Sequence, residues 1–446
     1  MSKWAWKLLA VLAVLSLVAA ACSNNNESTG GGGASGGGNQ PDCNADPFGC
    51  VTYGPGEPIR VGTLLAISGD VATLGVDSEH GVELAIDYLD GNFDGKAGQI
   101  LGHDVQLQNE DDLCSKEGGQ QGGTKLASDP TILFVVGTSC SSSAFGVADK
   151  ILGDKGIILV SPSNTAAGLT AESTHNPFYL RTAQNDAIQG RVVADFVYNK
   201  LGFTKAATIH DESPYAAGLT DGFGTFFEQL GGTITDAEAI QSTDTDFKPL
   251  LTSIAQSEPQ LIYAPDFNPA CALLAKQMLD IPDLKGVPYM GSDGCAASTF
   301  FDQAGDAANG TYMSFPLPSP GGTTSALLDT YNKAYKDQFG NPTAAFNTNA
   351  FDAFNVVAEA IKQVGVEGSD GTLTISRTAL KDAVFQVKDY AGLTGTLTCI
   401  STGDCQSLAA VNIGVFQLPD IPIEGGNQDA KPIFNETITL SDALGS

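Results

Sequence analysis

The sequence predicts an α/β protein built on parallel sheets with helices on both faces. Three observations lead to this fold class. From Ile59 onward, short apolar runs alternate with stretches whose apolar residues recur at helical spacing. Several runs, such as "TILFVVG", are unbroken, which is typical of parallel strands that are buried on both faces. Small and polar residues follow many of these runs, and ligands of such sheets bind outside the carboxyl ends of the strands.

The first half of the pattern contains four predicted strands. "IRVGTLLA", which starts at Ile59, is the first strand, and a helix follows it. In this helix the apolar residues repeat at helical spacing, at Val82, Ala85, Ile86 and Leu89. "HDVQLQNED" alternates between polar and apolar residues as a strand does, and "TILFVVG" and "KGIILVSP" are continuous apolar strands.

Further strand–helix units follow. "KAATIHD" precedes a predicted helix over 218–230, and "PQLIYAPD" precedes one around 270–279. Polar clusters stand at five strand ends, in "GTSCSSS", "SPSNT", "HDESPYAAG", "APDFNPA" and "GSDGCAAS". Because the carboxyl ends of parallel strands meet at one edge of a sheet, these clusters predict one cleft between two lobes.

The N-terminal residues 1–21 have the order of a secretory signal. Lys3 and Lys7 precede an apolar run over 8–20, and small residues follow up to Cys22. The apolar run is shorter than the roughly 20 residues that span a bilayer. An uncleaved anchor is the alternative.

The sequence "VAAAC" around the end of this segment resembles the lipobox of bacterial lipoproteins. We therefore expect cleavage before Cys22 and lipidation of its side chain, although Ala19 stands where that motif usually has a leucine-like residue. A plain secretory signal would leave the cysteine unmodified. Residues 22–57 are then a tether rich in Gly, Ser and Asn, which ends in a short segment with two cysteines. The protein is expected to be exported and anchored only by its lipid at the extracytoplasmic face of a bacterial membrane.

The composition is that of a folded and strongly acidic protein. The formal net charge is −29, with 16% charged and 42% hydrophobic residues. Such a surface repels nucleic-acid phosphates, so DNA and RNA are not expected as partners. The 4 histidines are scattered and no Cys-x-x-Cys occurs, so neither a metal site nor a cofactor is expected.

The 9 cysteines of an exported chain are expected to form disulfides. Apart from Cys22, two pairs are close in sequence, Cys43 with Cys50 and Cys399 with Cys405. The other four are Cys114, Cys140, Cys271 and Cys295. Because eight cysteines allow 105 connectivities, spacing alone leaves the pairing open.

The stretch "VVGTSCSSSAFGVADKILGDKGIILVSPSNTAAGLT" resembles the leucine/isoleucine/valine-binding protein family, the type I periplasmic solute receptors of ABC importers. The resemblance continues in family order through "FYLRTAQNDAIQG", "IHDESPYAAGL", "IYAPDFNPA", "YMGSDG" and "NIGVFQ" and covers roughly 58–418. It implies two Rossmann-like lobes, joined by three crossovers, that close on a ligand like a clamshell.

The resemblance also implies the boundaries of the lobes and two disulfides. Lobe 1 is expected over 58–183 and 315–411, and lobe 2 over 184–314 and 412–418. Residues 419–446 remain as a C-terminal tail. The family has a disulfide that matches Cys114–Cys140 here, which leaves Cys271–Cys295 as the last pair.

The polar residues after the strand "TILFVVG" are the first expected ligand contacts. A helix that begins near Ser141 would leave amide N–H groups and a positive potential for an anion. The resemblance places the α-carboxylate of an amino acid on the hydroxyls of Ser141 and Thr165. Ser163, through its backbone carbonyl, would accept a hydrogen bond from the ammonium. The serines alone would equally suit helix caps.

A buried ammonium needs a negative partner, and the resemblance implies Asp293 for this role. The family has a glutamate there, so the shorter aspartate requires a closer ligand or an intervening water. Tyr215 matches a family aromatic that closes over the ligand, and Phe267 lies near another aromatic position. Leu74 replaces an aromatic residue in the expected side-chain pocket, which leaves room for a different ligand side chain.

The expected function is the capture of an amino acid, first of all a branched-chain one, by a monomer that delivers it to ABC permease subunits. A receptor of the same fold for an amide, urea or aromatic acid is one alternative, and a ligand-sensing ectodomain is another. No enzyme is expected, because "GTSCSSS" is not a nucleophile elbow and "GGQQGG" lacks the lysine of a phosphate loop. Residues 90–101 imitate a calcium loop, but Leu101 stands where its glutamate would be.

Overall fold

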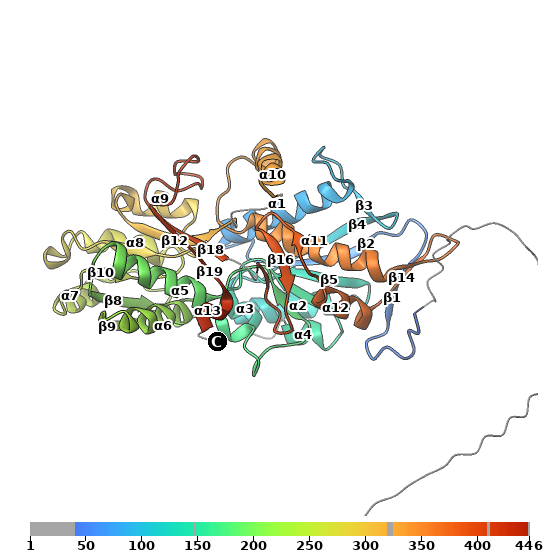
Figure 1. Ribbon diagram of the computed structural model, residues 1–446, viewed down its shortest axis with the longest axis horizontal. Coiled ribbons are helices and arrows are strands. Elements are labelled where there is room, and N and C mark those ends of the chain that lie inside the picture. Colours follow the sequence, from blue (N-terminus) through green and yellow to red (C-terminus); the bar gives the residue numbers. More distant parts are fainter. Residues whose placement is uncertain (1–40, 146–148, 319–323, 408–410, 445–446) are drawn as a thin grey trace, which may run out of the picture. The chain divides into compact units, whose positions relative to one another are not determined.

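The computed structural model describes residues 41–145, 149–318, 324–407 and 411–444. The expected signal segment, the lipidation site Cys22 and most of the tether therefore lie outside the described residues. The described chain contains a six-stranded sheet, a seven-stranded sheet and two three-stranded sheets. The two larger sheets and their covering helices confirm the predicted α/β fold class (Figure 1).

The six-stranded sheet holds the strands predicted in the first half of the chain. In spatial order they are β3 (Gln99–Ile100), β4 (His103–Asp111), β2 (Ile59–Leu65), β5 (Ile132–Gly137), β6 (Ile158–Ser161) and β7 (Tyr179–Arg181). All pairs are parallel except that between β3 and β4. Every residue of β5 and β6 is buried, as their unbroken apolar runs predicted.

Helices cover both faces of this sheet. They are α1 (Ala72–Asp87), α2 (Lys116–Ser128), α3 (Ser141–Ser143), α4 (Asp149–Gly153), α10 (Thr324–Phe339), α11 (Asn347–Val364) and α12 (Arg377–Phe385). Apolar residues of α1 and α11 form one core with the sheet, and Leu126 of α2 and Leu152 of α4 form the core on the other face. Gly81 allows α1 and α11 to approach closely, because a Cβ there would lie 2.1 Å from the carbonyl oxygen of Asn347.

The seven-stranded sheet contains the later strands. In spatial order they are β19 (Phe434–Ile438), β18 (Val411–Gln417), β12 (Tyr312–Leu317), β11 (Tyr289–Gly291), β10 (Leu261–Tyr263), β8 (Lys205–His210) and β9 (Thr233–Ala239). The strands from β12 to β9 are parallel, and β18 and β19 are antiparallel to their neighbours.

Helices also cover both faces of the second sheet. They are α5 (Asp186–Asp195), α6 (Pro214–Gln229), α7 (Lys248–Ala255), α8 (Ala270–Met278), α9 (Ser298–Ala304) and α13 (Leu440–Leu444). Residues of α7, α8 and α9 form one apolar core with the sheet, and residues of α5 and α6 form another. The predicted helices over 218–230 and 270–279 correspond to α6 and α8.

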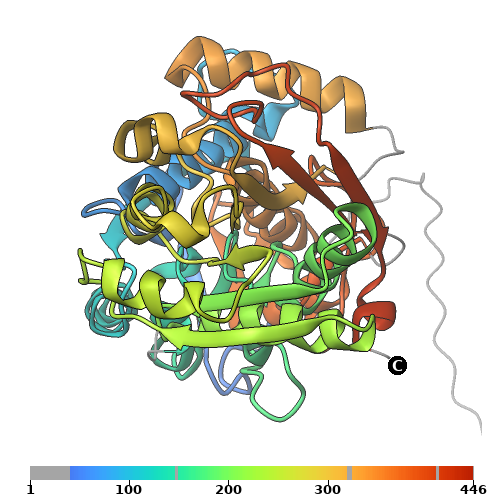
Figure 2. The same ribbon diagram turned by 90° about the vertical axis from the view of Figure 1, so that its left-hand side faces the viewer.

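The C-terminal segment differs from the expected tail. After β18, residues 419–444 return to the second sheet as its edge strand β19, and α13 then lies against α5. Figure 2 shows this red strand and short red helix near the marked C-terminal end. The chain passes between the two large sheets three times, after β7, after β12 and before β18.

Two small antiparallel sheets complete the described chain. One contains β1 (Cys50–Tyr53), β14 (Leu373–Ser376) and β13 (Val366–Glu367), and the other β15 (Tyr390–Ala391), β16 (Thr396–Cys399) and β17 (Cys405–Gln406). The structure contains the disulfides Cys43–Cys50, Cys114–Cys140, Cys271–Cys295 and Cys399–Cys405. These are the four pairs named from the sequence and the family resemblance.

The loop over 90–101 that imitates a calcium site is organised by a carboxylate of the preceding helix α1. Asp87 accepts hydrogen bonds from the backbone N–H groups of Asp94, Gly95 and Lys96. Within the described ranges, no group of three or more His, Cys, Asp or Glu side chains is placed to hold a metal ion. The same ranges contain no helix that is long and apolar enough to cross a membrane.

Candidate functional site

The turn after β5 begins at a glycine that no other residue could replace. Gly137 has a φ of 150°, and a Cβ on it would lie 2.2 Å from the carbonyl oxygen of Leu64 in β2. The close approach of β5 to β2 therefore requires glycine at this position. The chain then enters the short helix α3, which begins at Ser141.

Three hydroxyls of this turn fasten it to neighbouring segments. Ser139 Oγ accepts a hydrogen bond from the Ala66 N–H at 2.9 Å. Ser142 Oγ donates to the carbonyl oxygen of Cys114 at 3.1 Å. Ser143 Oγ reaches the carbonyl oxygen of Asp112 at 3.4 Å. Most of the hydroxylated cluster therefore has a structural role.

Ser141 is the hydroxyl of the turn that remains suited to a ligand. Its Oγ accepts a hydrogen bond from the backbone N–H of Ala166 at 3.2 Å, and no described residue accepts its proton. The side chain is 2% exposed. A buried hydroxyl with a spare proton can donate to a carboxylate.

The side chain of Asp112 stabilises the turn after β5 by hydrogen bonds. Its carboxylate accepts hydrogen bonds from the backbone N–H of Ser139 at 2.6 Å and of Cys114 at 2.7 Å. Burial raises the pKa of Asp112 to about 7, and these backbone hydrogen bonds oppose the rise. Asp112 thus links the two segments that the disulfide Cys114–Cys140 joins.

Removing this disulfide is expected to lower the free energy of unfolding by about 3 kcal/mol. The bond joins cysteines 26 residues apart, and closing such a loop restricts the unfolded chain. We would replace both Cys114 and Cys140 with alanine and measure unfolding by denaturant. As a control, the same change at Cys399 and Cys405, which are 6 residues apart, should cost about 1 kcal/mol less. Equal losses in the two variants would contradict the loop-length argument.

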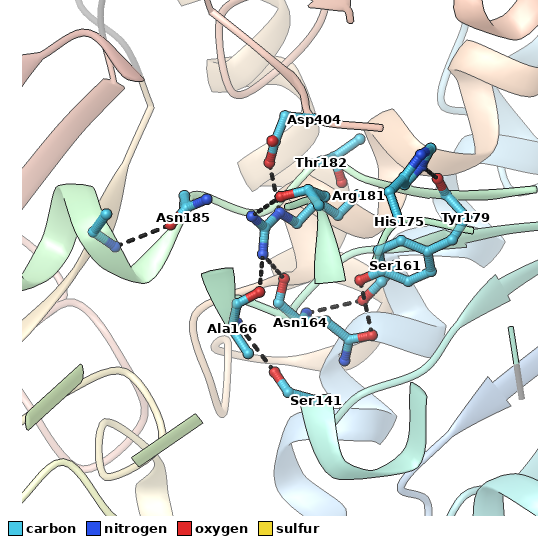
Figure 3. A network of polar contacts seen from close by, with 12 residues as sticks. Ser141, Ser161, Asn164, Ala166, His175, Tyr179, Arg181, Thr182, Asn185 and Asp404 are labelled. Carbon is cyan, nitrogen blue, oxygen red and sulfur yellow. Dashed lines mark hydrogen bonds and ion pairs between the residues drawn. The ribbon is translucent and has the colours of Figure 1, made fainter. Parts of the chain in front are cut away.

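Arg181, the last residue of β7, supports the loop that carries Ser163 and Thr165. This side chain is fully buried. Its guanidinium donates to the carbonyl oxygens of Asn164 (3.2 Å) and Ala166 (2.9 Å), to the Thr170 hydroxyl (2.6 Å) and to the Asp404 carboxylate (2.6 Å). Figure 3 shows the guanidinium between the loop and Asp404.

The same loop is bonded to the serine turn. Asn164 Nδ2 donates to the carbonyl oxygen of Thr138, and Ser163 Oγ donates to that of Ser139, at 2.9 and 2.8 Å. These bonds fix the position of Thr165. Its buried Oγ1 makes no hydrogen bond of ordinary geometry with the described residues, and its nearest carboxylate partner is Asp186. The first lobe thus presents two candidate hydroxyls, those of Ser141 and Thr165.

The two predicted aromatic contacts lie in segments packed on the second sheet. Tyr215 lies in the first turn of α6, and Phe267 follows β10. Their ring centroids are 4.9 Å apart. The Tyr215 hydroxyl accepts a hydrogen bond from the Gly294 N–H at 2.8 Å. Phe267 also packs against the apolar cluster that contains Leu74 and Cys140, so it joins the two sheets.

Asp293 lies in the loop after β11 and is 4% exposed. Its Oδ1 accepts a hydrogen bond from Gln189 Nε2 at 2.7 Å and lies 3.2 Å from Ser292 Oγ. Burial raises the pKa of Asp293 to about 6, and the hydrogen bonds from Gln189 and its neighbours limit the rise. The Asp293 carboxyl is therefore expected to change its charge at about pH 6.

Asp186, which the sequence analysis missed, lies beside these residues. It is the first residue of α5, and its backbone N–H donates to the carbonyl oxygen of Thr165 at 3.0 Å. Burial and the charge of Asp293 raise its pKa well above the ordinary value, while Thr165 and Arg181 oppose the rise. The only signal in the sequence was an acid directly after Asn185, within the stretch "FYLRTAQNDAIQG" that carries the family resemblance.

The seven predicted ligand residues thus lie at the junction of the two sheets, in two groups. Leu74 and Asp293 line one small cavity together with Asp70, Val71, Thr73, Asn268, Gly294, Ala297, Thr299 and Ala344. Phe267 and Tyr215 lie next to it. Ser141, Ser163 and Thr165 do not line this cavity. They are connected to it through Asp186, which is bonded to Thr165 and interacts electrostatically with Asp293.

Comparison with known proteins identifies relatives over most of this chain. The family described as periplasmic binding protein matches residues 58–412. The "Leu/Ile/Val-binding protein homolog 3" of Brucella melitensis is 29% identical over 82% of this chain and 93% of its own. The Leu/Ile/Val-binding protein BraC3 of Rhizobium johnstonii is 30% identical over 78% of this chain and 89% of its own.

Solved structures share the fold at lower identity. The substrate-binding protein LivJ of Streptococcus pneumoniae, in complex with isoleucine, has a TM-score of 0.70 and 23% identity and covers 86% of this chain and 99% of its own. A solute-binding protein of R. palustris, in complex with benzoate, has a TM-score of 0.67 and 21% identity over 86% of this chain and 95% of its own. The fold therefore serves receptors for amino acids and for aromatic acids.

Proposed function

This chain belongs to the periplasmic binding protein family, whose members are solute-binding proteins, and on that premise we propose that it is a receptor for an amino acid of the branched-chain class. The ligand would bind between the two lobes and pass to the permease subunits of an ABC transporter. The observation that carries the proposal is the buried carboxyl of Asp293 at the junction where Ser141 and Thr165 present hydroxyls.

The junction offers hydrogen-bond donors for the α-carboxylate of an amino acid and acceptors for its ammonium group. Ser141 and Thr165 would donate hydrogen bonds to the α-carboxylate, and the carbonyl oxygen of Ser163 would accept one from the ammonium. Asp293 would supply the negative charge that a buried ammonium requires. Tyr215 and Phe267 would cover the ligand from the second lobe, and Leu74 would line the side-chain pocket.

The proposed binding cycle follows from the two-lobed architecture. The expected boundaries of 315 and 411 need a small correction, because β12 (Tyr312–Leu317) and β18 (Val411–Gln417) both belong to the seven-stranded sheet. One lobe would then contain the six-stranded sheet and its helices, and the other the seven-stranded sheet and its helices. An open form would present the hydroxyls, and closure would bring Asp293, Tyr215 and Phe267 onto the ligand. Membership of this family indicates that the protein is located outside the cytoplasm. We further propose that the protein is a monomer, that a lipid on Cys22 tethers it to the membrane, and that it catalyses no reaction.

The proposal predicts saturable binding of leucine, isoleucine or valine. Isothermal titration of the purified protein, dialysed free of bound solute, measures it. The two Leu/Ile/Val-binding relatives, at 29% and 30% identity, favour these three ligands. Titration with benzoate tests the alternative that the benzoate complex of the same fold raises. Binding of benzoate with no binding of any amino acid would contradict the proposal.

A further inference from the structure

We propose that a second cavity, at the crossovers between the two large sheets, is a separate binding site for a small uncharged carboxamide with an apolar body. This site goes beyond the proposed function. The crossover cavity has a volume of about 540 Å³, within the range of roughly 300–1,000 Å³ that is typical of small-molecule sites. The cavity lined by Leu74 and Asp293 is much smaller, about 10 Å³.

The crossover cavity lies where the chain passes from one large sheet to the other. Residues next to all three crossovers line it, among them Gln184 after β7, Pro318 after β12 and Val411 at the start of β18. Residues of α10 and of the C-terminal segment 422–429 complete the lining. The small cavity in the cleft shares only Ala344 with it. A ligand in one cavity therefore leaves room for a ligand in the other.

Gln406 in β17 is the main evidence for an amide ligand. The residue lines the crossover cavity and is 4% exposed, and neither its Oε1 nor its Nε2 has a hydrogen-bond partner among the described residues. Unpaired polar atoms at a buried position destabilise a folded protein. Both atoms are shielded from solvent, so a rotation of the side chain toward the cavity would bring them to a ligand. A carboxamide offers an N–H to the oxygen and a carbonyl to the nitrogen, so it satisfies both at once.

Two other buried amides of the lining have partners within the chain. Asn349 Nδ2 donates to a backbone carbonyl oxygen at 2.9 Å. Asn347 donates to a carboxylate at 2.9 Å and accepts a hydrogen bond from a tyrosine hydroxyl at 3.0 Å. The contrast with Gln406 supports a partner for Gln406 from outside the chain.

The rest of the lining favours an uncharged molecule with an apolar body. Apolar side chains contribute from both sides, such as Leu328 of α10 and Ile423 of the C-terminal segment. The charged residues of the lining, Lys333, Lys336 and Asp429, have both signs and are exposed to solvent. Exposed charges of mixed sign give little attraction to an ion, so neither an anion nor a cation is favoured.

Gln184 connects the crossover cavity to the proposed cleft. Its Nε2 donates to Gln189 Oε1 at 2.7 Å, and Gln189 Nε2 donates to Asp293 Oδ1 at 2.7 Å. Gln184 Oε1 has no partner among the described residues. A ligand that donates to this oxygen would strengthen the chain of hydrogen bonds, because such bonds polarise one another. The ionised form of Asp293 would be stabilised, and on the basis of the proposed function leucine should then bind more tightly.

The test is isothermal titration of the full-length protein, dialysed free of solute. The probes are 3-phenylpropanamide and 3-phenylpropanoate, which share one apolar body, and only the amide has N–H groups. We expect the amide to bind at least tenfold more tightly than the carboxylate. Gln406→Met should weaken amide binding by about tenfold, because two hydrogen bonds are lost. The control is Gln256→Met at an exposed position after α7, which should bind the amide as the wild type does.

A second variant covers the case in which Gln406→Met does not fold. Methionine has nearly the volume of glutamine, so without ligand the Tm of Gln406→Met should equal or exceed that of the wild type. Leu328→Trp changes a partly buried residue on the α10 side of the cavity. The larger ring should fill the space and abolish amide binding while leucine binding persists.

Titrations with both ligands present test the location of the site. With saturating amide, we expect leucine still to bind, about twofold or more tightly, and leucine should raise the affinity for the amide by the same factor. Displacement of the amide by leucine would place the amide in the cleft and refute the crossover site. An unchanged leucine affinity would refute the link through Gln184.

The crossover site and the proposed function can fail separately. A wild-type protein that does not bind the amide, or a Gln406→Met variant that binds it within twofold of the wild type, would refute the site and leave the proposed function standing. A protein that binds the amide but no amino acid would contradict the proposed function, and the effect of Gln406→Met would still decide on the crossover site.

Discussion

Replacing Asp293 with asparagine is expected to weaken amino-acid binding by about a hundredfold or more. The change keeps the shape of the side chain and an oxygen that can accept the Gln189 hydrogen bond. It removes the charge that would face the ligand ammonium, and loss of one partner of a buried, hydrogen-bonded charge pair costs about 2–5 kcal/mol. Isothermal titration with leucine gives the difference in affinity.

The same variant should be more stable than the wild type when no ligand is present. Burial raises the pKa of Asp293 to about 6, so the unfolded chain ionises this carboxyl at lower pH than the folded protein does. Below about pH 4 the carboxyl is protonated in both the folded and the unfolded state, and it does not reduce the free energy of unfolding. As the pH rises through about 6, ionisation increasingly favours the unfolded state, and the free energy of unfolding falls. At pH 7 this loss reaches up to about 3 kcal/mol, and Asp293→Asn avoids it.

Opposite effects on binding and stability distinguish a ligand contact from a structural residue. If Asp293 were purely structural, its replacement would lower the Tm and would leave the leucine affinity of the folded fraction unchanged. Asp302→Asn, at an exposed position of the nearby helix α9, serves as the control and should change neither quantity. An Asp293→Asn variant that binds leucine like the wild type would exclude Asp293 as the ammonium partner.

The fold could be predicted because its signals are local. Unbroken apolar runs specify buried parallel strands, and β5 and β6 are buried throughout. The C-terminal segment is the exception. In "IFNETITL" the residues of β19 alternate between partly buried and exposed, and its role as an edge strand depends on β18, which is adjacent only in the folded chain.

The candidate site could be predicted only in part. The serine cluster pointed to the turn after β5, but three of its hydroxyls bond to neighbouring segments, and those segments are distant in sequence. Asp186 escaped notice because an acid at a helix start has an ordinary explanation as a cap. Its significance depends on burial and on the approach of Asp293, which lies 107 positions later in the chain. No pattern in a single sequence contains that information.

Replacing Asp404 with alanine is expected to cause the largest loss of stability, about 3–5 kcal/mol. Arg181 is fully buried, and without Asp404 its charge would have no ionic partner among the contacts described for it. Burial disfavours the charge on Arg181, and Asp404 is the first of the groups that hold its pKa above the usual value. Denaturant unfolding measures the loss.

A matched control shows whether burial is the cause. Lys248 and Asp280 form an ion pair at 2.8 Å on the surface, where both side chains are more than half exposed. Asp280→Ala should therefore cost no more than about 1 kcal/mol. Similar losses for Asp404→Ala and Asp280→Ala would contradict the assignment of Asp404 as the partner of a buried charge.

The Arg181–Asp404 pair also connects stability with binding. Asp404 precedes β17, from which the chain crosses to the second sheet, and Arg181 holds the carbonyl oxygens on both sides of Thr165 (Figure 3). Removing the Asp404 carboxylate would weaken the hydrogen bonds from Arg181 to these carbonyl oxygens. The folded fraction of Asp404→Ala should therefore also bind leucine several-fold more weakly than the wild type.

The double variant Arg181→Met, Asp404→Ala should recover stability relative to Asp404→Ala, because no buried charge remains. It should not recover leucine affinity, since the guanidinium that supports the Thr165 loop is also gone. Recovery of both would mean that the loop holds its position without Arg181.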